Sequence, residues 1–201
     1  MGTDQIPSDI LDLYEVHEWR HASAILMNDF PEEWQDIVTV LRGFRLLRSS
    51  VIVGGGGLSL IAQALDNPFK DLGWVTQPFE TTVTVNKATL DSITHKVDRF
   101  KSRVALEVEW NNKDPFYARD LEAFARLFDL RAISIGVMIT RCDELQGIFN
   151  GLYDVDGKSV GRKYGASTTH MSKLLPCMER GGAGGCPVLV FGITPRLYVE
   201  D

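Results

Sequence analysis

Cysteine is scarce in this chain of 201 residues, and its three cysteines are not spaced as zinc ligands. Cys142, Cys177 and Cys186 form an odd set without a Cys-x-x-Cys pair. Zinc ribbons and disulfide frameworks both require paired cysteines, so the sequence suggests neither of them. Because free thiols persist in a reducing compartment, we expect a cytoplasmic protein.

Long apolar runs are also missing. No stretch is apolar over the roughly 20 residues that a membrane-spanning helix needs. Residues 1–9 have neither the basic start nor the apolar run of a secretory signal peptide. We therefore expect a protein that is not exported and has no membrane partner.

An excess of positive charge is the third absence. The chain has 21 basic and 27 acidic residues, which gives a net charge of −6 at pH 7. DNA-binding domains usually present a basic surface, because its cations displace the counterions of the phosphates. A DNA-binding role therefore requires cations that cluster locally. Three groups do so: Arg42, Arg45 and Arg48; residues 96–103; and Lys158, Arg162, Lys163, His170 and Lys173.

The pattern of apolar residues predicts one α/β domain. A chain of this length, with 44% hydrophobic residues, can bury one core but not two generous ones. Residues 116–128 predict an amphipathic helix between two strands, 103–110 and 132–139, which together make a βαβ unit with parallel pairing. Further predictions are helices at 30–47 and 58–65, strands at 79–85 and 187–193, a helical or mixed segment at 14–24, and a connector or short helix at 86–94.

Three carboxylates stand where they can meet at one metal ion. Side chains alternate between the faces of a strand, so Glu107 and Glu109 share a face with Ala105, and Asp98 arrives from the preceding turn. Carboxylate oxygens of this kind suit Mg²⁺, with room left for water and a phosphate, and phosphodiester hydrolysis needs such a site. The alternative is that the acids merely form the wet face of a half-buried strand.

A long glycine-rich segment, 142–186, is expected to be mostly loop, and loops of this length are usually functional or disordered. Its part from residue 161 to 173 mixes cations, hydroxyls and an imidazole, which suits contacts to phosphates and base edges. A solvated surface loop is the alternative. Ser167, Thr168 or Thr169 is also a candidate N-cap for a helix over 171–178.

The glycine run 54–57 lacks the Lys-Ser/Thr of a nucleotide-binding P-loop, and only part of a Gly-x-Gly-x-x-Gly motif is present. A tight turn, or a close approach of the backbone to DNA, is favoured over nucleotide binding.

The phrase Arg103-Val-Ala-Leu-Glu107-Val-Glu109-Trp110, with Asp98 before it, resembles the catalytic motif of type II restriction endonucleases of the PD-(D/E)xK superfamily, in particular the BglII and BstYI group. The similarity extends, in order, to residues 14–17, 30–37, 58–65, 73–74 and 187–194. The resemblance implies an α/β, restriction-endonuclease-like core with a mixed central β-sheet flanked by helices. It also implies one endonuclease domain over 1–201, with a helical part at about 1–50, a catalytic core at about 51–140, a recognition region at about 142–186 and a closing strand at 187–194.

The resemblance further implies a Mg²⁺-dependent enzyme that cuts double-stranded DNA at a palindromic site centred on GATC and leaves 5′ overhangs. Asp98, Glu107 and Glu109 would be catalytic, and Asp98 and Glu107 would bind the metal. Glu109 replaces the Gln of the relatives, as in BamHI, so it could accept a proton from water or bind a second metal. The DNA-binding residues would be Arg162, Lys163, Ser167, Thr168, Thr169, His170 and Lys173.

The implied partners are a second copy of the chain, because a two-fold protein reads a palindrome economically, and a cognate DNA methyltransferase. The apolar stripe 124–128 or the N-terminal helices could supply the dimer interface. Two other functions stay open from the residues alone: a nucleotide or other phosphate-ligand enzyme that uses Gly54 to Gly57, and a non-catalytic α/β interaction protein.

Overall fold

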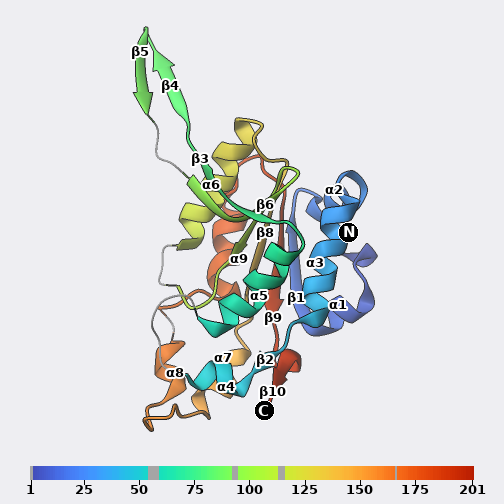
Figure 1. Ribbon diagram of the computed structural model, residues 1–201, viewed down its shortest axis with the longest axis vertical. Helices are drawn as coiled ribbons and strands as arrows, with labels where there is room; N and C mark the ends of the chain where they lie inside the picture. Colours follow the sequence, from blue (N-terminus) through green and yellow to red (C-terminus); the bar gives the residue numbers. More distant parts are fainter. Residues whose placement is uncertain (1, 54–58, 92–94, 113–115, 166) are drawn as a thin grey trace.

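The computed structural model describes residues 2–53, 59–91, 95–112, 116–165 and 167–201. A six-stranded mixed sheet with the strand order β1-β9-β8-β7-β6-β3 runs through the molecule (Figure 1). Its strands are β1 (Tyr14–Trp19), β3 (Val75–Phe79), β6 (His95–Lys101), β7 (Val104–Val108), β8 (Ile135–Arg141) and β9 (Val188–Ile193). The predicted mixed α/β core is confirmed.

The three middle strands are parallel, and the outer strands run antiparallel to their neighbours. The helices are α1 (Ser8–Leu13), α2 (Ala22–Asp29), α3 (Pro31–Gly43), α4 (Arg48–Ile52), α5 (Leu60–Asp71), α6 (Phe116–Asp129), α7 (Leu145–Asn150), α8 (Val160–Lys163) and α9 (Met171–Glu179), with 3-10 turns η1 (Gly2–Gln5) and η2 (Pro195–Leu197). The predicted βαβ unit is β7-α6-β8.

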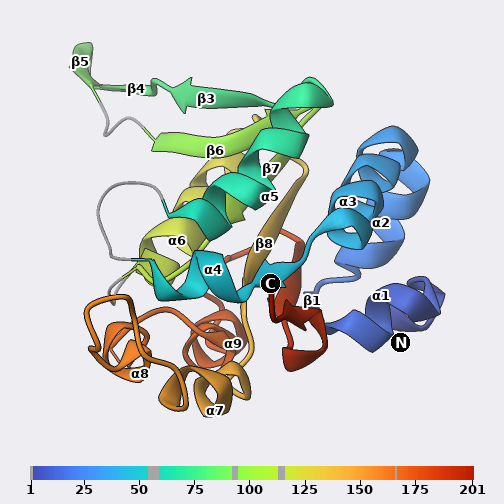
Figure 2. The same cartoon turned by 60° about the horizontal axis from the view of Figure 1, so that its bottom comes forward.

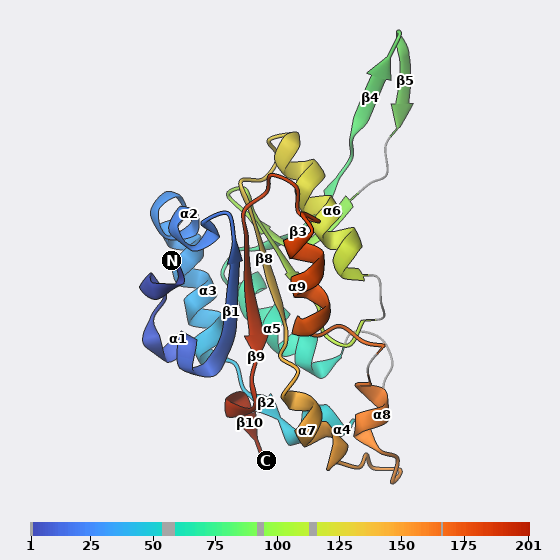
Figure 3. The ribbon, with the colours of Figure 1, turned by 180° about the vertical axis from the view of Figure 1, so that it is seen from behind.

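Helices cover both faces of the sheet. Leu106 and Val108 of β7 belong to the apolar cluster that also includes residues of α3 and α5. Ala105 of the same strand belongs to a second cluster with residues of α6 and α9, which Figure 3 shows in front of the sheet. The alternation of β7 therefore directs its acids to the face covered by α6.

A two-residue turn joins β6 to β7. Ser102 has φ 47° and Arg103 has φ 80°, and positive φ at both central residues of such a turn matches the twist of the strands that it connects. Lys101 pairs with Val104 directly across this turn. The sequence-based placement of Asp98 in a preceding turn is thus wrong, because Asp98 lies on a neighbouring antiparallel strand.

Strand pairing refines three other sequence-based assignments. The segment 14–24, expected to be helical or mixed, is mixed: residues 14–19 form strand β1, which pairs along the whole of β9, and α2 begins at Ala22. The predicted strand 79–85 is divided between β3 and β4 (Thr82–Val85). Strand β4 pairs with β5 (Ala88–Asp91) in the expected connector, and the two project from the body as a hairpin (Figure 1).

The segment 142–186 is mostly turns and irregular loop, as expected, but it also carries short helices. It contains α7, α8 and α9, and Figure 2 shows α7 and α8 near α4 at one end of the molecule. A short sheet of β2 (Leu46–Leu47) and β10 (Tyr198–Val199) lies at the same end. None of the helices in the described ranges has both the length and the apolar character that crossing a bilayer requires.

The ring of Phe124, on α6, packs against β8 at Gly136. A Cβ atom at position 136 would lie 2.6 Å from Cε2 and 2.8 Å from Cγ of that ring. We expect Gly136→Ala to destabilise the fold by about 1–3 kcal/mol, because the ring must move within a closely packed core. Gly147→Ala in α7 is the control, since nothing lies within 4 Å of its new Cβ, and it should be neutral or stabilising by up to about 1 kcal/mol. Urea denaturation measures both, and equal effects would contradict this packing.

Candidate active site

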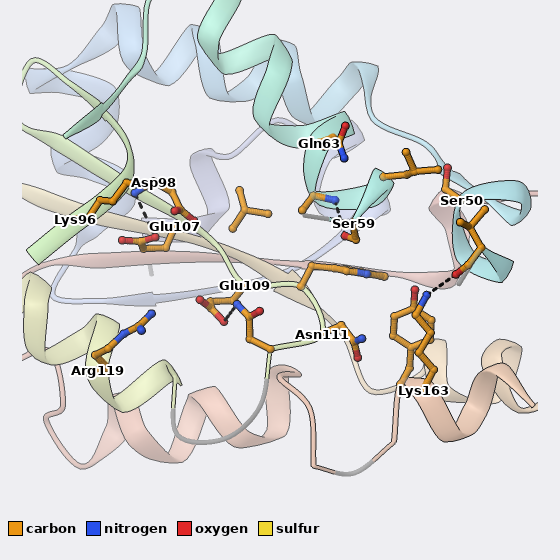
Figure 4. A pocket seen from close by; sticks show the side chains of 17 residues that line it. Ser50, Ser59, Gln63, Lys96, Asp98, Glu107, Glu109, Asn111, Arg119 and Lys163 are labelled. Atoms are coloured by element: carbon orange, nitrogen blue, oxygen red, sulfur yellow. Dashed lines mark hydrogen bonds between the residues drawn. The ribbon is translucent and has the colours of Figure 1, made fainter. Parts of the chain in front are cut away.

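A cavity of about 540 Å³ opens at the end of β7, between α5 on one side and the start of α6 on the other (Figure 4). Asp98, Glu107 and Glu109 all line it. A second cavity of about 490 Å³ shares Asp98 and Glu107 with the first. The three acids singled out in the sequence therefore meet in one continuous hollow.

Asp98 and Glu107 lie side by side on adjacent strands. Arg99 faces Leu106 in the register of β6 and β7, and continuing this register by one residue sets Asp98 opposite Glu107. The Asp98 backbone N–H donates to Glu107 Oε2 at 3.4 Å (Figure 4). The hairpin turn at Ser102 and Arg103 sets this register, so the turn chemistry places the two carboxylates together.

Burial separates these acids from ordinary surface charges. Glu107 is 6% exposed and Glu109 is 2% exposed, whereas Asp98 is half-buried. Water therefore solvates the two glutamates poorly, and the alternative that they form a wet strand face is wrong. Buried carboxylates are costly unless they are paired, protonated or bound to a cation.

The surroundings favour the protonated form of both glutamates. Burial, followed by the negative charge of Asp98, raises the pKa of Glu107 well above its usual range. Burial and then the nearby charge of Asp120 raise the pKa of Glu109 to about 9. The amide Nδ2 of Asn112 opposes this by donating to Glu109 Oε2 at 2.8 Å. Without a cation, the site tends to retain protons.

Asp120 is a fourth acid that the sequence analysis missed. It lies on α6, is 4% exposed and lines the second cavity with Asp98 and Glu107. Burial raises the pKa of its carboxyl. A signal was available in the sequence, because position 120 lies on the apolar stripe that contains Tyr117, Leu121 and Phe124.

Cations surround the acids. Lys96 and Arg119 line both cavities, Arg126 lines the second one, and Lys163 reaches the first from α8. Lys96 was predicted as part of a basic stretch, but Arg119 and Arg126 were not, because they are brought to the site by the helix rather than by a charged run. The acidic chain thus has local positive charge where its carboxylates gather.

The acids are not arranged around a single ion. Within the ranges that the structure describes, no group of three or more His, Cys, Asp or Glu side chains is positioned to hold a metal. The predicted ligands Asp98 and Glu107 supply only two carboxylates, which do not fill the coordination sphere of Mg²⁺. Water and DNA oxygens would therefore have to complete the coordination of Mg²⁺, which commonly keeps several waters.

A comparison with models of protein families matches residues 14–193 to the family described as Restriction endonuclease BglII/BglIII. The match spans the central sheet, all four acids and the segment of α7 to α9. The chain belongs to this family. It is a type II restriction endonuclease, a site-specific deoxyribonuclease that binds DNA. A comparison with curated proteins gives no match.

In the endonuclease, some of the predicted DNA-binding residues are exposed, and others are buried or hydrogen-bonded within the chain. Arg162 and Ser167 are exposed, whereas Lys163 donates from Nζ to the backbone oxygen of Val53 at 2.7 Å. Thr168 and Thr169 are buried at 6% and 0% exposure. Nothing within this single polar run distinguishes its exposed residues from its buried ones.

A buried cation explains the inward position of Thr168. Arg141, at the end of β8, is 1% exposed and donates from Nη2 to Thr168 Oγ1 at 3.0 Å and to the Tyr164 backbone oxygen at 2.8 Å. The ring of Tyr164 packs on Phe149, with 4.5 Å between the centroids, and on Trp110 at 5.8 Å. The loop after α8 is thereby fixed to the residue that follows Glu109.

The N-terminus of α9 is capped differently from the prediction. His170 is the N-cap residue and makes no side-chain capping bond. Asp143 acts in its place, because its Oδ2 accepts from the Ser172 backbone N–H at 2.9 Å. Its Oδ1 lies 2.7 Å from His170 Nδ1. Lys173 is half-buried on the first turn of α9, and the glycine run 54–57 lies outside the described residues.

The raised pKa of Glu109 should make the free energy of unfolding depend on pH. Between the ordinary value of 4.5 and the folded value of about 9, the folded state holds a proton that the unfolded chain has released. Folding stability therefore falls as the pH rises through this window. The side chain of Glu109→Gln cannot ionise. In EDTA, we therefore expect the free energy of unfolding of this variant, relative to that of the wild type, to be higher at pH 8 than at pH 5 by at least about 1 kcal/mol.

Urea denaturation at the two pH values measures this difference. Glu122→Gln, an exposed acid on α6, is the control and should keep the pH dependence of the wild type. If the free energy of unfolding depends on pH in the same way for the wild type and for Glu109→Gln, the raised pKa of Glu109 is contradicted.

Proposed function

We propose that the endonuclease is Mg²⁺-dependent and hydrolyses phosphodiester bonds of double-stranded DNA with Asp98, Glu107 and Glu109. The observation that carries the proposal is the gathering of buried carboxylates at the end of β7, in a cavity lined by Lys96, Arg119 and Lys163. The cations suit the phosphates of DNA, and the acids suit a divalent ion.

The donor set fits Mg²⁺. The clustered acids offer only hard oxygen ligands, and Oδ2 of Asp120 is buried without a hydrogen-bond partner among the described residues. Asp98 and Glu107 are the residues proposed to hold the ion, because they lie together across β6 and β7. When bound, Mg²⁺ supplies positive charge that stabilises the negatively charged phosphoryl transition state.

Glu109 is proposed to accept a proton from the attacking water. Its Oε2 is oriented by Asn112 Nδ2 at 2.8 Å, so its carboxyl plane is fixed beside the other acids. The water oxygen forms a new bond to phosphorus, the bond to the leaving sugar oxygen breaks, the water proton passes to the Glu109 carboxylate, and the leaving oxyanion takes a proton from solvent. A Gln at this position could orient water but not take its proton.

DNA binding is proposed for the cations and polar residues that border the cavity. Arg162, Lys163 and Lys173 would contact phosphates, and Ser167 and His170 would contact base edges. Thr168 and Thr169 would contact DNA only after the loop turns outward, since both are buried here. Lys96, Arg119 and Arg126 extend the same set of cations along the second cavity.

We propose a palindromic target centred on GATC, cut to leave 5′ overhangs, as the family resemblance implies. A homodimer would place one set of acids at each strand, and a cognate methyltransferase would protect the host site. The α6 stripe is not available as its interface, because Phe124 is fully buried against the sheet of its own chain. The N-terminal helices α1 to α3 remain as the proposed interface.

The direct test is Glu107→Ala. We expect cleavage of plasmid in Mg²⁺ to fall to background while DNA binding survives or tightens, because the remaining acids repel the phosphate less. Nicking assays and fluorescence anisotropy of a labelled duplex measure the two properties. Asp129→Ala, an exposed acid at the last residue of α6, is the control and should cut normally. Undiminished cutting by Glu107→Ala, or by the wild type in EDTA, would refute the proposal.

A further inference from the structure

The side chains of β6 break their alternation at Asp98. Val97 packs in the apolar cluster that includes residues of α6 and α9, and Asp98 lines the second cavity beside α6. Arg99 instead reaches α5, where its Nη2 donates to Asp66 Oδ2 at 2.6 Å. In a regular strand, Val97 and Arg99 would share one face and Asp98 would point to the other. Here Val97 and Asp98 point to the same face, the one that carries the acids.

An extra residue in β6 accounts for this break. The register with β3 shifts by one residue, so that Thr76 alone stands opposite both Asp98 and Arg99. Two residues against one make a β-bulge, and bulges next to active sites re-aim side chains. Regular alternation from Val97 onward would direct Asp98 to the face of α5, away from Glu107. The bulge therefore brings the first acid to the other carboxylates.

The guanidinium of Arg99 fastens this bulge. Arg99 is 2% exposed, and its Nη1 donates to Thr76 Oγ1 at 2.6 Å and to the backbone oxygen of Asp98. Its Nη2 donates to Asp66 Oδ2 at 2.6 Å, and its Nε donates to the Asp66 backbone oxygen at 3.4 Å. One side chain thus ties the residue that carries the first acid to β3 and to α5.

Packing alone does not call for a pair of charges between α5 and β6. The side chains of Arg99 and Asp66 are 3% and 13% exposed, so both charges have left water. Oδ1 of Asp66 is buried and has no hydrogen-bond partner among the described residues. Burial raises the pKa of this carboxyl even though Arg99 opposes the shift. Because well-packed apolar side chains often replace a buried ion pair without loss of stability, the pair calls for another role.

We propose that Asp66 and Arg99 are positioning residues, which hold the β-bulge that directs the Asp98 carboxylate towards Glu107. The inference rests on the proposed function, because it concerns the orientation of one proposed Mg²⁺ ligand. Neither Asp66 nor Arg99 touches the reacting atoms. The loss of groups that orient a metal ligand typically lowers metal affinity or activity by about 10- to 100-fold.

The test replaces the pair as a unit. The double variant Asp66→Leu, Arg99→Met removes both charges and fills their space, so its melting temperature in EDTA should equal or exceed that of the wild type. Mn²⁺ is titrated into DNA-free protein at pH 8, and the free ion is measured by electron paramagnetic resonance. We expect the double variant to bind Mn²⁺ about 10- to 100-fold more weakly than the wild type. Its cutting rate at saturating DNA in Mg²⁺ should fall, while its affinity for a labelled duplex in EDTA stays unchanged.

A second ion pair of β6 supplies the matched control. Lys101 lies on the same strand outside the bulge, and its Nζ is 2.7 Å from Asp36 Oδ2 on α3. The double variant Asp36→Asn, Lys101→Met should bind Mn²⁺ with wild-type affinity. If the variant of the bulge pair fails to fold, Arg99→Lys takes its place. A lysine can keep the pair with Asp66 but lacks the fork of donors that also reaches Thr76, so Mn²⁺ binding should weaken again.

The outcomes separate this inference from the proposed function. Wild-type Mn²⁺ affinity in the folded variant, or an equal loss of affinity in the control, would overturn the positioning role. If the wild type cuts only with Mg²⁺ while the variant keeps both its metal affinity and its cutting rate, this inference alone is rejected. A wild type that binds no Mn²⁺, never cuts, or cuts in EDTA would reject the proposed function itself.

Discussion

Repulsion among carboxylates that are shielded from water is the constraint on which this molecule depends. Glu107, Glu109 and Asp120 are each no more than 6% exposed, and Asp98 lies beside them. Such a group is tolerated only if its members are protonated or neutralised by cations. The apolar clusters on both faces of the sheet provide the rigid frame that holds the acids together against this repulsion.

The elements around the acids each fix one part of the site. The tight turn between β6 and β7 aligns Asp98 with Glu107, and the crossover helix α6 brings Asp120 and Arg119 to the same hollow. Trp110, directly after Glu109, packs against Tyr164 at the end of α8. A movement of the proposed DNA-contacting loop would therefore be transmitted by packing to the catalytic strand, which gives recognition a physical route to the acids.

The sequence predicted the strand β7 well, because strand alternation is local and places Glu107 and Glu109 on one face whatever surrounds them. It also predicted α6 and the parallel pair β7 and β8. It left the conformation of residues 14–19 open between helical and mixed, because the strand β1 depends on pairing with β9 near the other end of the chain. It equally missed the inward turn of Thr168, because the guanidinium that binds it comes from Arg141, 27 residues earlier. Long-range partners decided both cases.

We propose that these buried acids make a metal-dependent, sequence-specific double-strand cutter. Digestion of a plasmid with wild-type protein in Mg²⁺, followed by sequencing of the product ends, tests it most directly, with plasmid prepared with and without adenine methylation. We expect linear products whose ends all fall at one palindrome with GATC at its centre and carry 5′ overhangs. Ends scattered over unrelated sequences, nicked circles as the final product, or the same cutting in EDTA would contradict the account.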